Sequence, residues 1–184
     1  MDPATLPGAL IVVVGPQASG KSALAAALSA QLRQQGELVA LVELDQIAAM
    51  ALPTLPSWET AHQIFESTTG MWARAELTCV IAEGSGTQQE VSRLLSQAPA
   101  STTTVTVVTT APFDVAFARA QADPTRGISK ERSFLASVYE RWSDEITRIT
   151  ADVLIDTSTL TIAHGVERVQ EALSSARRHR FEAC

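Results

Sequence analysis

The sequence of 184 residues contains 46% hydrophobic and 18% charged residues, which is typical of a globular chain and excludes a disordered one. Its net charge of −6 disfavours a nucleic-acid-binding surface, and no apolar run approaches the roughly 20 residues of a membrane-spanning helix. The two cysteines, Cys79 and Cys184, form no disulfide framework, and the first residues lack the basic start of a secretion signal. We therefore expect a cytoplasmic protein with one domain over residues 1–184.

The first elements in the chain surround a glycine-containing loop. A short apolar run rich in β-branched residues at 9–14 predicts a buried parallel strand, and residues 23–35, which lack Pro and Gly, predict a helix. Between them, Gly15-Pro16-Gln17-Ala18-Ser19-Gly20-Lys21-Ser22 matches the P-loop pattern G-x-x-x-x-G-K-[ST]. A strand that turns through glycines into a helix directs backbone N–H groups and the helix dipole at an anion.

This loop is therefore the predicted triphosphate site. Lys21 would reach the β- and γ-phosphates of ATP, and the Ser22 hydroxyl would ligate Mg²⁺. The alternative is a glycine-containing turn that matches the pattern by chance. The predicted nucleotide contacts are Gly15, Gln17, Ala18, Ser19, Gly20, Lys21 and Ser22.

The rest of the chain alternates strands with helices. Strands are expected at 38–44, 78–82, 102–109 and 153–155. Helices are expected at 46–52, 58–77, 88–97, 113–122, 130–150 and 162–177. Five apolar strands that alternate with helices predict a three-layer α/β fold, in which helices cover both faces of a five-stranded parallel sheet.

A glycine and several polar residues follow the ends of the predicted strands. They are Gly15, Asp45, Glu83, the Thr109-Thr110 turn and Asp156. Ligands of such sheets bind at the carboxyl ends of the strands, so these residues should converge on one crevice.

Two of these residues are carboxylates with a predicted chemical role. Asp45 could accept the proton of an acceptor hydroxyl or hold Mg²⁺ through water; alternatively, or in addition, it could cap the helix at 46–52. Glu83 could hold metal-bound water or a substrate hydroxyl, and its alternative is a solvated position in a loop.

A cluster of cations predicts a lid at about 123–132. It consists of Arg119, Arg126, Lys130 and Arg132, with Gly127 among them. Arginine over a γ-phosphate stabilises the charge of the transition state, and a closing lid excludes water. Arg119 and Arg126 are the expected contacts, and the alternative is a solvated helix start with Glu131 as the partner.

Other residues are expected to be structural. His62, His164 and His179 lack metal-ligand spacing and are assigned to the surface. Trp58, Phe65, Trp72 and Trp142 follow helical spacing and are assigned to the core. The basic run at 177–180 is expected to be a frayed, solvated helix end.

The P-loop proteins include regulatory GTPases, which this sequence does not fit. It contains no asparagine, so a guanine-reading N-K-x-D motif is impossible, and it has no D-x-x-G. What remains resembles the small-molecule kinases of the nucleoside-monophosphate kinase superfamily. The chain is most similar to the chloramphenicol phosphotransferase-like branch, with shikimate and gluconate kinases as cousins. The resemblance rests on residues 15–22, 43–47, 80–84, 119–132 and 156–158.

The resemblance implies a strand order of 2-3-1-4-5 and a set of roles. Asp45 would act as base towards the acceptor hydroxyl, and Arg119 and Arg126 in the lid would clamp phosphate. Thr157 and Ser158, after the fifth strand, would border the adenine. The chain departs from its relatives in its short lid, in Glu83 where many carry Asp, and in lacking an Asp-Arg pair after the second strand.

The resulting hypothesis is an ATP- and Mg²⁺-dependent kinase whose acceptor is a small hydroxylated molecule, a metabolite or an antibiotic. Lys21, Asp45 and Arg126 are its predicted catalytic residues, and Ser22 and Glu83 its predicted metal ligands. One alternative is a nucleoside or nucleotide kinase, and another is a regulatory module that binds ATP without transferring phosphate. No nucleic-acid or membrane partner is expected, and the protein is expected to be a monomer or a homodimer.

Overall fold

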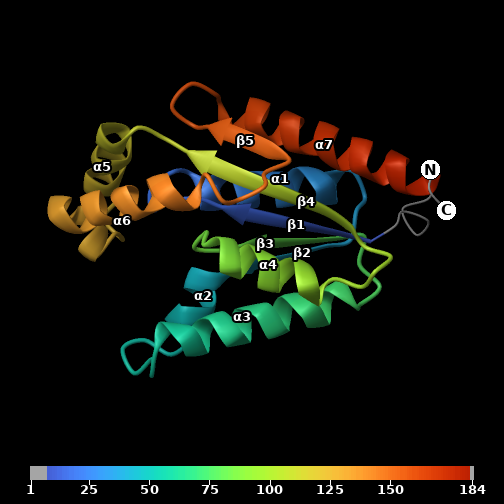
Figure 1. Ribbon diagram of the computed structural model, residues 1–184, viewed down its shortest axis with the longest axis horizontal. Coiled ribbons are helices and arrows are strands. Elements are labelled where there is room, and N and C mark those ends of the chain that lie inside the picture. The colour runs from blue at the N-terminus through green and yellow to red at the C-terminus, as the bar shows by residue number, and fades with distance from the viewer. Residues whose placement is uncertain (1–7, 183–184) are drawn as a thin grey trace.

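The computed structural model describes residues 8–182, and Cys184 and the first seven residues lie outside this range. Five parallel strands form one sheet in the order β2-β3-β1-β4-β5 (Figure 1). The strands are β1 (Ala9–Val14), β2 (Val39–Glu43), β3 (Cys79–Glu83), β4 (Thr103–Thr110) and β5 (Val153–Asp156). The predicted fold class and strand order are confirmed.

Helices cover both faces of the sheet (Figure 1). On one face lie α1 (Lys21–Gln34) and α7 (Ile162–Glu182). On the other lie α2 (Leu44–Ala49), α3 (Trp58–Ala73) and α4 (Gln88–Gln97). Beyond the carboxyl ends of the strands, α5 (Phe113–Ala122), the short 3₁₀ helix η2 (Ile128–Lys130) and α6 (Arg132–Glu145) follow one another. Within residues 8–182, no helix is long and apolar enough to cross a membrane.

Strand β1 contributes to two cores because successive side chains of a strand point to opposite faces. Ile11 and Val13 pack with apolar side chains of α1 and α7, whereas Leu10, Val12 and Val14 pack with those of α3, α4 and α6. All six residues of β1 are buried. The loop that follows β1 therefore starts from a strand that is buried along its whole length.

Several helices differ from their predicted bounds. The helix predicted at 130–150 is α6, which ends at Glu145, although Ile146 and Ile149 still pack into the core from the turn that follows. Apolar spacing therefore continued past the end of the helix. The helix predicted at 58–77 likewise ends at Ala73.

The prediction of a solvated helix end at 177–180 is wrong for Arg177. Helix α7 continues to Glu182, and Arg177 is buried. Its guanidinium donates two hydrogen bonds of 2.8 Å to the Glu37 carboxylate and a third of 2.8 Å to the Thr78 carbonyl. This contact ties α7 to the amino ends of β2 and β3.

Candidate active site

The loop between β1 and α1 is held in a conformation that requires glycine. Gly15 and Gly20 have φ angles of +156° and +95°, and a Cβ atom on Gly15 would overlap Thr109 of β4. The Ser19 hydroxyl lies 2.7 Å from that of Thr109, so this side chain fastens the loop to β4. Gly20 precedes the first residue of α1, and Lys21 and Ser22 form the first turn of that helix. The loop thus ends at a helix N-terminus, where backbone N–H groups lack partners within the helix.

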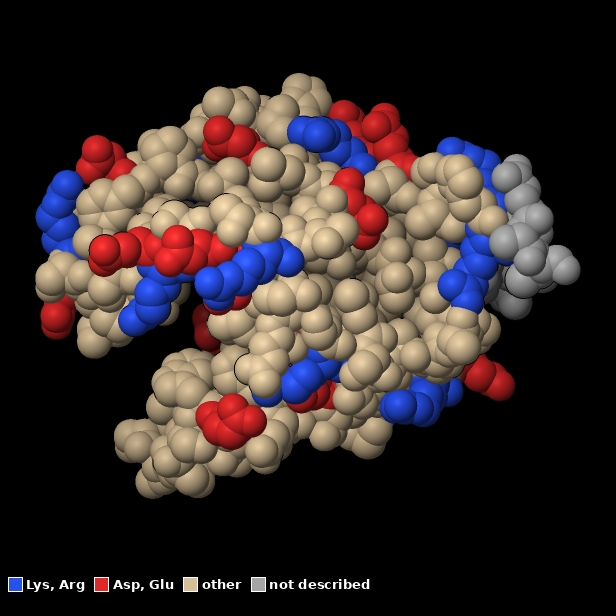
Figure 2. All heavy atoms as spheres, in the orientation of Figure 1, with Lys and Arg blue, Asp and Glu red and all other residues tan. Residues whose placement is uncertain are grey.

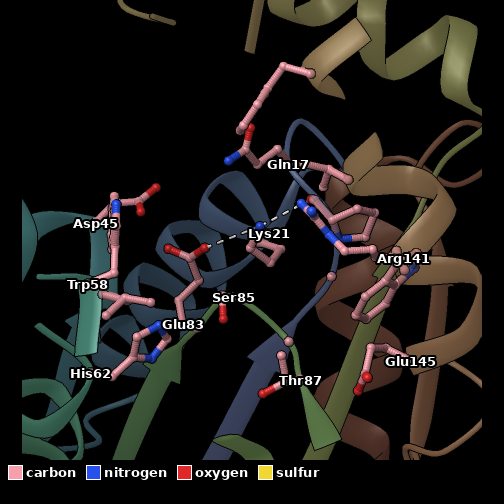
Figure 3. Close-up of a pocket in the computed structure, with 18 residues that line it drawn as sticks. Gln17, Lys21, Asp45, Trp58, His62, Glu83, Ser85, Thr87, Arg141 and Glu145 are labelled. Carbon is pink, nitrogen blue, oxygen red and sulfur yellow. Dashed lines mark hydrogen bonds and ion pairs between the residues drawn. The ribbon is translucent and has the colours of Figure 1, made fainter. Parts of the chain in front are cut away.

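Lys21 and Ser22 both reach Glu83 at the end of β3. Figure 3 shows the contact between Lys21 and Glu83. Lys21 Nζ lies 3.8 Å from Glu83 Oε1 and donates a hydrogen bond of 3.1 Å to the Pro16 carbonyl. The Ser22 hydroxyl donates to Glu83 Oε2 over 3.3 Å. Burial raises the pKa of Glu83 to about 7, although Lys21 opposes this, and burial lowers the pKa of Lys21. Glu83 is therefore not the solvated loop residue of the alternative interpretation.

Ser22 and Glu83 fit the requirements of a magnesium site. Mg²⁺ prefers oxygen ligands and commonly takes only one or two from the protein, the rest coming from water and phosphate. A hydroxyl and a carboxylate oxygen lie together at the helix N-terminus that faces the predicted phosphates. In the described part of the chain, no group of three or more His, Cys, Asp or Glu side chains could hold a metal by itself.

Asp45 is not the N-cap of a helix, so the alternative prediction that it caps the helix at 46–52 is wrong. Strand β2 ends at Glu43, one residue earlier than predicted, and Leu44 already begins α2 because its side chain turns into the core. Asp45 is the second residue of α2, and its side chain is exposed. Its carboxylate is therefore free to face the crevice beside Lys21 and Glu83 (Figure 3).

Two cavities meet at the carboxyl edge of the sheet, where the molecular surface is hollowed between α6 and the region of α2 and α3 (Figure 2). The larger one, of about 290 Å³, is the acceptor cavity. The smaller one, of about 140 Å³, is the phosphate cavity, which Gly20, Ser22, Arg119 and Arg126 help to line. Gln17, Lys21 and Asp45 line both cavities.

Arg119 is fixed by hydrogen bonds to the loop after β5. It donates one bond of 2.7 Å to the Thr157 hydroxyl and another of 2.7 Å to the Thr157 carbonyl. The Thr157 hydroxyl in turn donates to the Ser19 carbonyl over 2.7 Å. Thr157 therefore lies against the phosphate-binding loop. Ser158 is bonded within its own turn to Asp156 and lines neither cavity.

The predicted lid contacts the phosphate-binding loop, but its cations do not act together. Arg126 lines the phosphate cavity, and its Nε lies 3.2 Å from Asp123. Arg132 points elsewhere: it pairs with Asp114 and stacks over the rings of Phe113 and Phe117. The Ser129 hydroxyl donates to Gln17 Oε1 over 2.5 Å and closes this segment onto the loop.

The acceptor cavity is made largely of side chains for which the sequence predicted no role in a binding site. Trp58 and His62 come from α3, and Phe134, Val138, Arg141, Trp142 and Glu145 come from α6 (Figure 3). His62 is only 18% exposed and is not a surface residue, whereas Trp58 and Trp72 are 54% and 46% exposed and are not core residues. The sequence did contain one sign of this wall. The five cavity residues of α6 are spaced i, i+4, i+7, i+8 and i+11, which places them on one face of the helix.

Comparisons with known proteins agree with this geometry. Residues 10–132 match the sequence model of a family described as an AAA domain. No curated protein matches the chain significantly.

Among solved structures, similarity extends over nearly the whole chain. A putative kinase from Chloroflexus aurantiacus J-10-fl is 21% identical with a TM-score of 0.67, covering 94% of this chain and 99% of that one. A gluconokinase from Sinorhizobium meliloti 1021 is 19% identical with a TM-score of 0.66, covering 97% of this chain and 98% of that one. Shikimate kinase from Bacteroides thetaiotaomicron is 19% identical with a TM-score of 0.64, covering 90% and 98%. At these identities the likeness establishes a shared fold.

Proposed function

We propose that this chain, which belongs to the AAA domain family, is a kinase that transfers the γ-phosphate of ATP to a hydroxyl group of a small molecule. The observation that carries the proposal is the junction of the two cavities at Gln17, Lys21 and Asp45. A phosphate-binding loop supplies one side of this junction, and the free carboxylate of Asp45 supplies the other. The shared fold of a gluconokinase and a shikimate kinase supports the same interpretation.

The residues at the junction match the requirements of phosphoryl transfer, which are positioning and charge stabilisation. Asp45 takes the proton of the acceptor hydroxyl while the oxygen of that hydroxyl forms a bond to the γ-phosphorus of ATP. The bond from phosphorus to the bridging oxygen breaks, and ADP leaves with that oxygen. Lys21 and Arg126 line the phosphate cavity and would neutralise the charge on the transferred group. Mg²⁺, held by Ser22 and Glu83, would supply further positive charge at the phosphates.

The charges of the acceptor cavity argue against a nucleotide as acceptor. Among the described residues that line this cavity, Lys21 and Arg141 are the only Lys or Arg side chains. Three carboxylates line it as well, those of Asp45, Glu83 and Glu145. A phosphate-bearing acceptor needs a surplus of positive charge, so a molecule without phosphate fits this cavity better.

The experiment begins with a thermal-shift screen of hydroxylated metabolites and antibiotics in the presence of a non-hydrolysable ATP analogue. Compounds that stabilise the protein are then tested for acceptor-dependent ADP formation. Lys21→Ala should lower kcat by roughly 10²–10³-fold, because a charge that stabilises the transition state is lost. Arg168→Ala, which removes an exposed cation of α7, is the matched control and should leave kcat unchanged.

Two results would contradict the proposal. One is a Lys21→Ala variant that retains the turnover of the wild type. The other is ATP hydrolysis that no hydroxylated compound accelerates, which would favour a regulatory module that binds ATP without transferring phosphate.

A further inference from the structure

His62 is a largely buried residue that lines the acceptor cavity. The proposed chemistry gives it no role. It lies on α3, one helical turn after Trp58, and its ring faces the same cavity as Asp45 and Glu83 (Figure 3). Its Nδ1 atom is buried and has no hydrogen-bond partner in the described part of the chain. The nearest anionic atom is Oε2 of Glu90, at 3.7 Å.

Glu90 is a fully buried carboxylate that several hydrogen bonds hold in this position. It accepts hydrogen bonds from the backbone N–H groups of Ser85 at 3.0 Å and Gly86 at 3.3 Å, and from the Ser85 hydroxyl. A Cβ atom on Gly84 would overlap the Glu90 carboxylate, so the loop after β3 is shaped around it. The side chain therefore holds a carboxylate oxygen at a defined position beside His62.

This arrangement decides which nitrogen of His62 is available to a ligand. A carboxylate that faces Nδ1 favours the ring form with a proton on that nitrogen. In the neutral ring, Nε2 then carries a lone pair and accepts hydrogen bonds. Because Nδ1 is turned to Glu90, Nε2 is the ring nitrogen left for a molecule in the acceptor cavity.

We propose that His62, oriented by Glu90, is a specificity-determining residue that accepts a hydrogen bond from a second hydroxyl group of the acceptor. The proposal rests on the function inferred above and narrows its substrate class. One hydroxyl lies at Asp45, where it is phosphorylated, and another lies at His62. The rings of Trp58 and Trp142 line the same cavity and would contact the carbon body of such a diol.

The first test measures recognition without turnover. The full-length protein, labelled with ¹⁵N-histidine and saturated with Mg²⁺ and a non-hydrolysable ATP analogue, is titrated with cyclohexanol and with the 1,2-, 1,3- and 1,4-cyclohexanediols. At least one diol should bind about tenfold more tightly than cyclohexanol and shift the Nε2 resonance of His62, as expected for one hydrogen bond. Equal affinities, or a diol preference without movement of that resonance, would overturn the proposal, as would the absence of diol binding.

The second test uses variants of His62. His62→Phe keeps a ring of similar size and should abolish the preference for the diol, whereas His62→Gln keeps a hydrogen-bonding group and should restore part of it. With a diol that is phosphorylated, His62→Phe should raise KM about tenfold and leave kcat within about threefold. Thermal unfolding of both variants establishes that they are folded.

The outcomes separate this proposal from the proposed function. If an acceptor is phosphorylated in a manner that depends on Lys21 and its KM is unchanged in His62→Phe, the role of His62 is refuted and the kinase stands. If diols bind through His62 and no compound is phosphorylated, the kinase is refuted and the recognition site stands.

Discussion

At the scale of single residues, the site depends on charged groups that are partly withdrawn from water. Lys21 and Glu83 are 12% and 5% exposed, and 3.8 Å separates their charged atoms. Burial disfavours the charged form of each, which lowers the pKa of Lys21 and raises that of Glu83. Interactions between charges are stronger in such surroundings than at the exposed surface, because less water screens them. Lys21 and Glu83 should therefore interact strongly with the charges of a metal–triphosphate group that binds beside them.

Glu83 should make the stability of the nucleotide-free and metal-free protein depend on pH. Its pKa is about 7 in the folded state, against an ordinary value of 4.5. Between these values the folded state holds a proton that the unfolded chain has lost, so stability falls as pH rises from about 4.5 to about 7. Relative to Glu83→Gln, which cannot ionise, the wild type should lose on the order of 1–3 kcal/mol of unfolding free energy across this window. Urea unfolding at a series of pH values measures the difference, and a constant difference would contradict the burial argument.

Arg126 and Arg132 offer a matched pair of arginines in the predicted lid. Arg126 lines the phosphate cavity, whereas Arg132 stacks on Phe113 and Phe117. Arg126→Ala should lower kcat by roughly 10²–10³-fold with little change in the KM of ATP, because it removes charge from the transition state. Arg132→Ala should leave kcat unchanged. Steady-state kinetics with an identified acceptor would measure both, and equal losses in the two variants would argue against a specific role for Arg126.

The sequence reveals some of these residues and conceals others for a physical reason. The phosphate-binding loop is recognisable because its backbone needs glycine at Gly15 and Gly20 and its ligand needs Lys21 and Ser22. His62 and Trp58 carry no such signal, since a polar or aromatic residue on a helix has the same spacing whether it faces a cavity or solvent. Their position depends on where α3 packs, which a local pattern does not encode.

At the scale of elements, the buried contact between Arg177 and Glu37 holds α7 to the sheet. The guanidinium and the carboxylate are 10% and 8% exposed and meet through two hydrogen bonds. Removing one partner leaves the other as an uncompensated buried charge, which is costly.

This contact gives a stability prediction with a neighbouring control. Arg177→Ala should lower the free energy of unfolding by about 3–5 kcal/mol, measured in urea, whereas Arg178→Ala, at an exposed position of the same helix, should change it by less than about 0.5 kcal/mol. A double substitution, Arg177→Met with Glu37→Leu, should be less destabilising than Arg177→Ala, because no charge is left unpaired. A small loss in Arg177→Ala would show that the contact contributes little.

The elements themselves were predictable in type and order, and less so at their ends. All five strands appear where β-branched and apolar runs predict them, because strands buried on both faces need continuous apolar sequence. Helix α6 was predicted too long because Ile149 stays buried and Ile146 partly buried after the helix has ended. Apolar spacing reports which side chains are buried, and a turn can continue it without the backbone hydrogen bonds of a helix.

At the scale of the whole molecule, the site is assembled by the topology of the sheet. Parallel strands bring the residues after β1, β2 and β3 to one edge, where Lys21, Asp45 and Glu83 line the same cavity. The convergence of Asp45 and Glu83 on the phosphate-binding loop could be predicted from the order of strands and helices, whereas Asp156, which was expected in the same crevice, lines neither cavity. The walls of the acceptor cavity could not be predicted in this way, because α3 and α6 are more than 50 residues apart in the chain and meet only in the folded structure.

The lid belongs to this scale as well, since it joins two distant parts of the chain. Ser129 and Tyr139 both bond to Gln17, so the segment before α6 and the helix itself contact the phosphate-binding loop. Gln17, which lines both cavities, is thus hydrogen-bonded to the lid segment and to α6. A lid at about 123–132 that closes on the nucleotide stays a prediction.

The central claim is that Asp45 joins the two cavities as the base of a phosphoryl transfer, and kcat of Asp45→Asn tests it most directly. The substitution keeps the size of the side chain, and the exposed Asp144→Asn serves as its control. With an acceptor from the screen and Mg²⁺ at the concentration that saturates the wild type, kcat of Asp45→Asn should fall by roughly 10²–10⁴-fold, while the KM of ATP changes little. Excess Mg²⁺ should not restore the rate, as it would if Asp45 only ordered the metal. An Asp45→Asn variant with the kcat of the wild type would contradict the account.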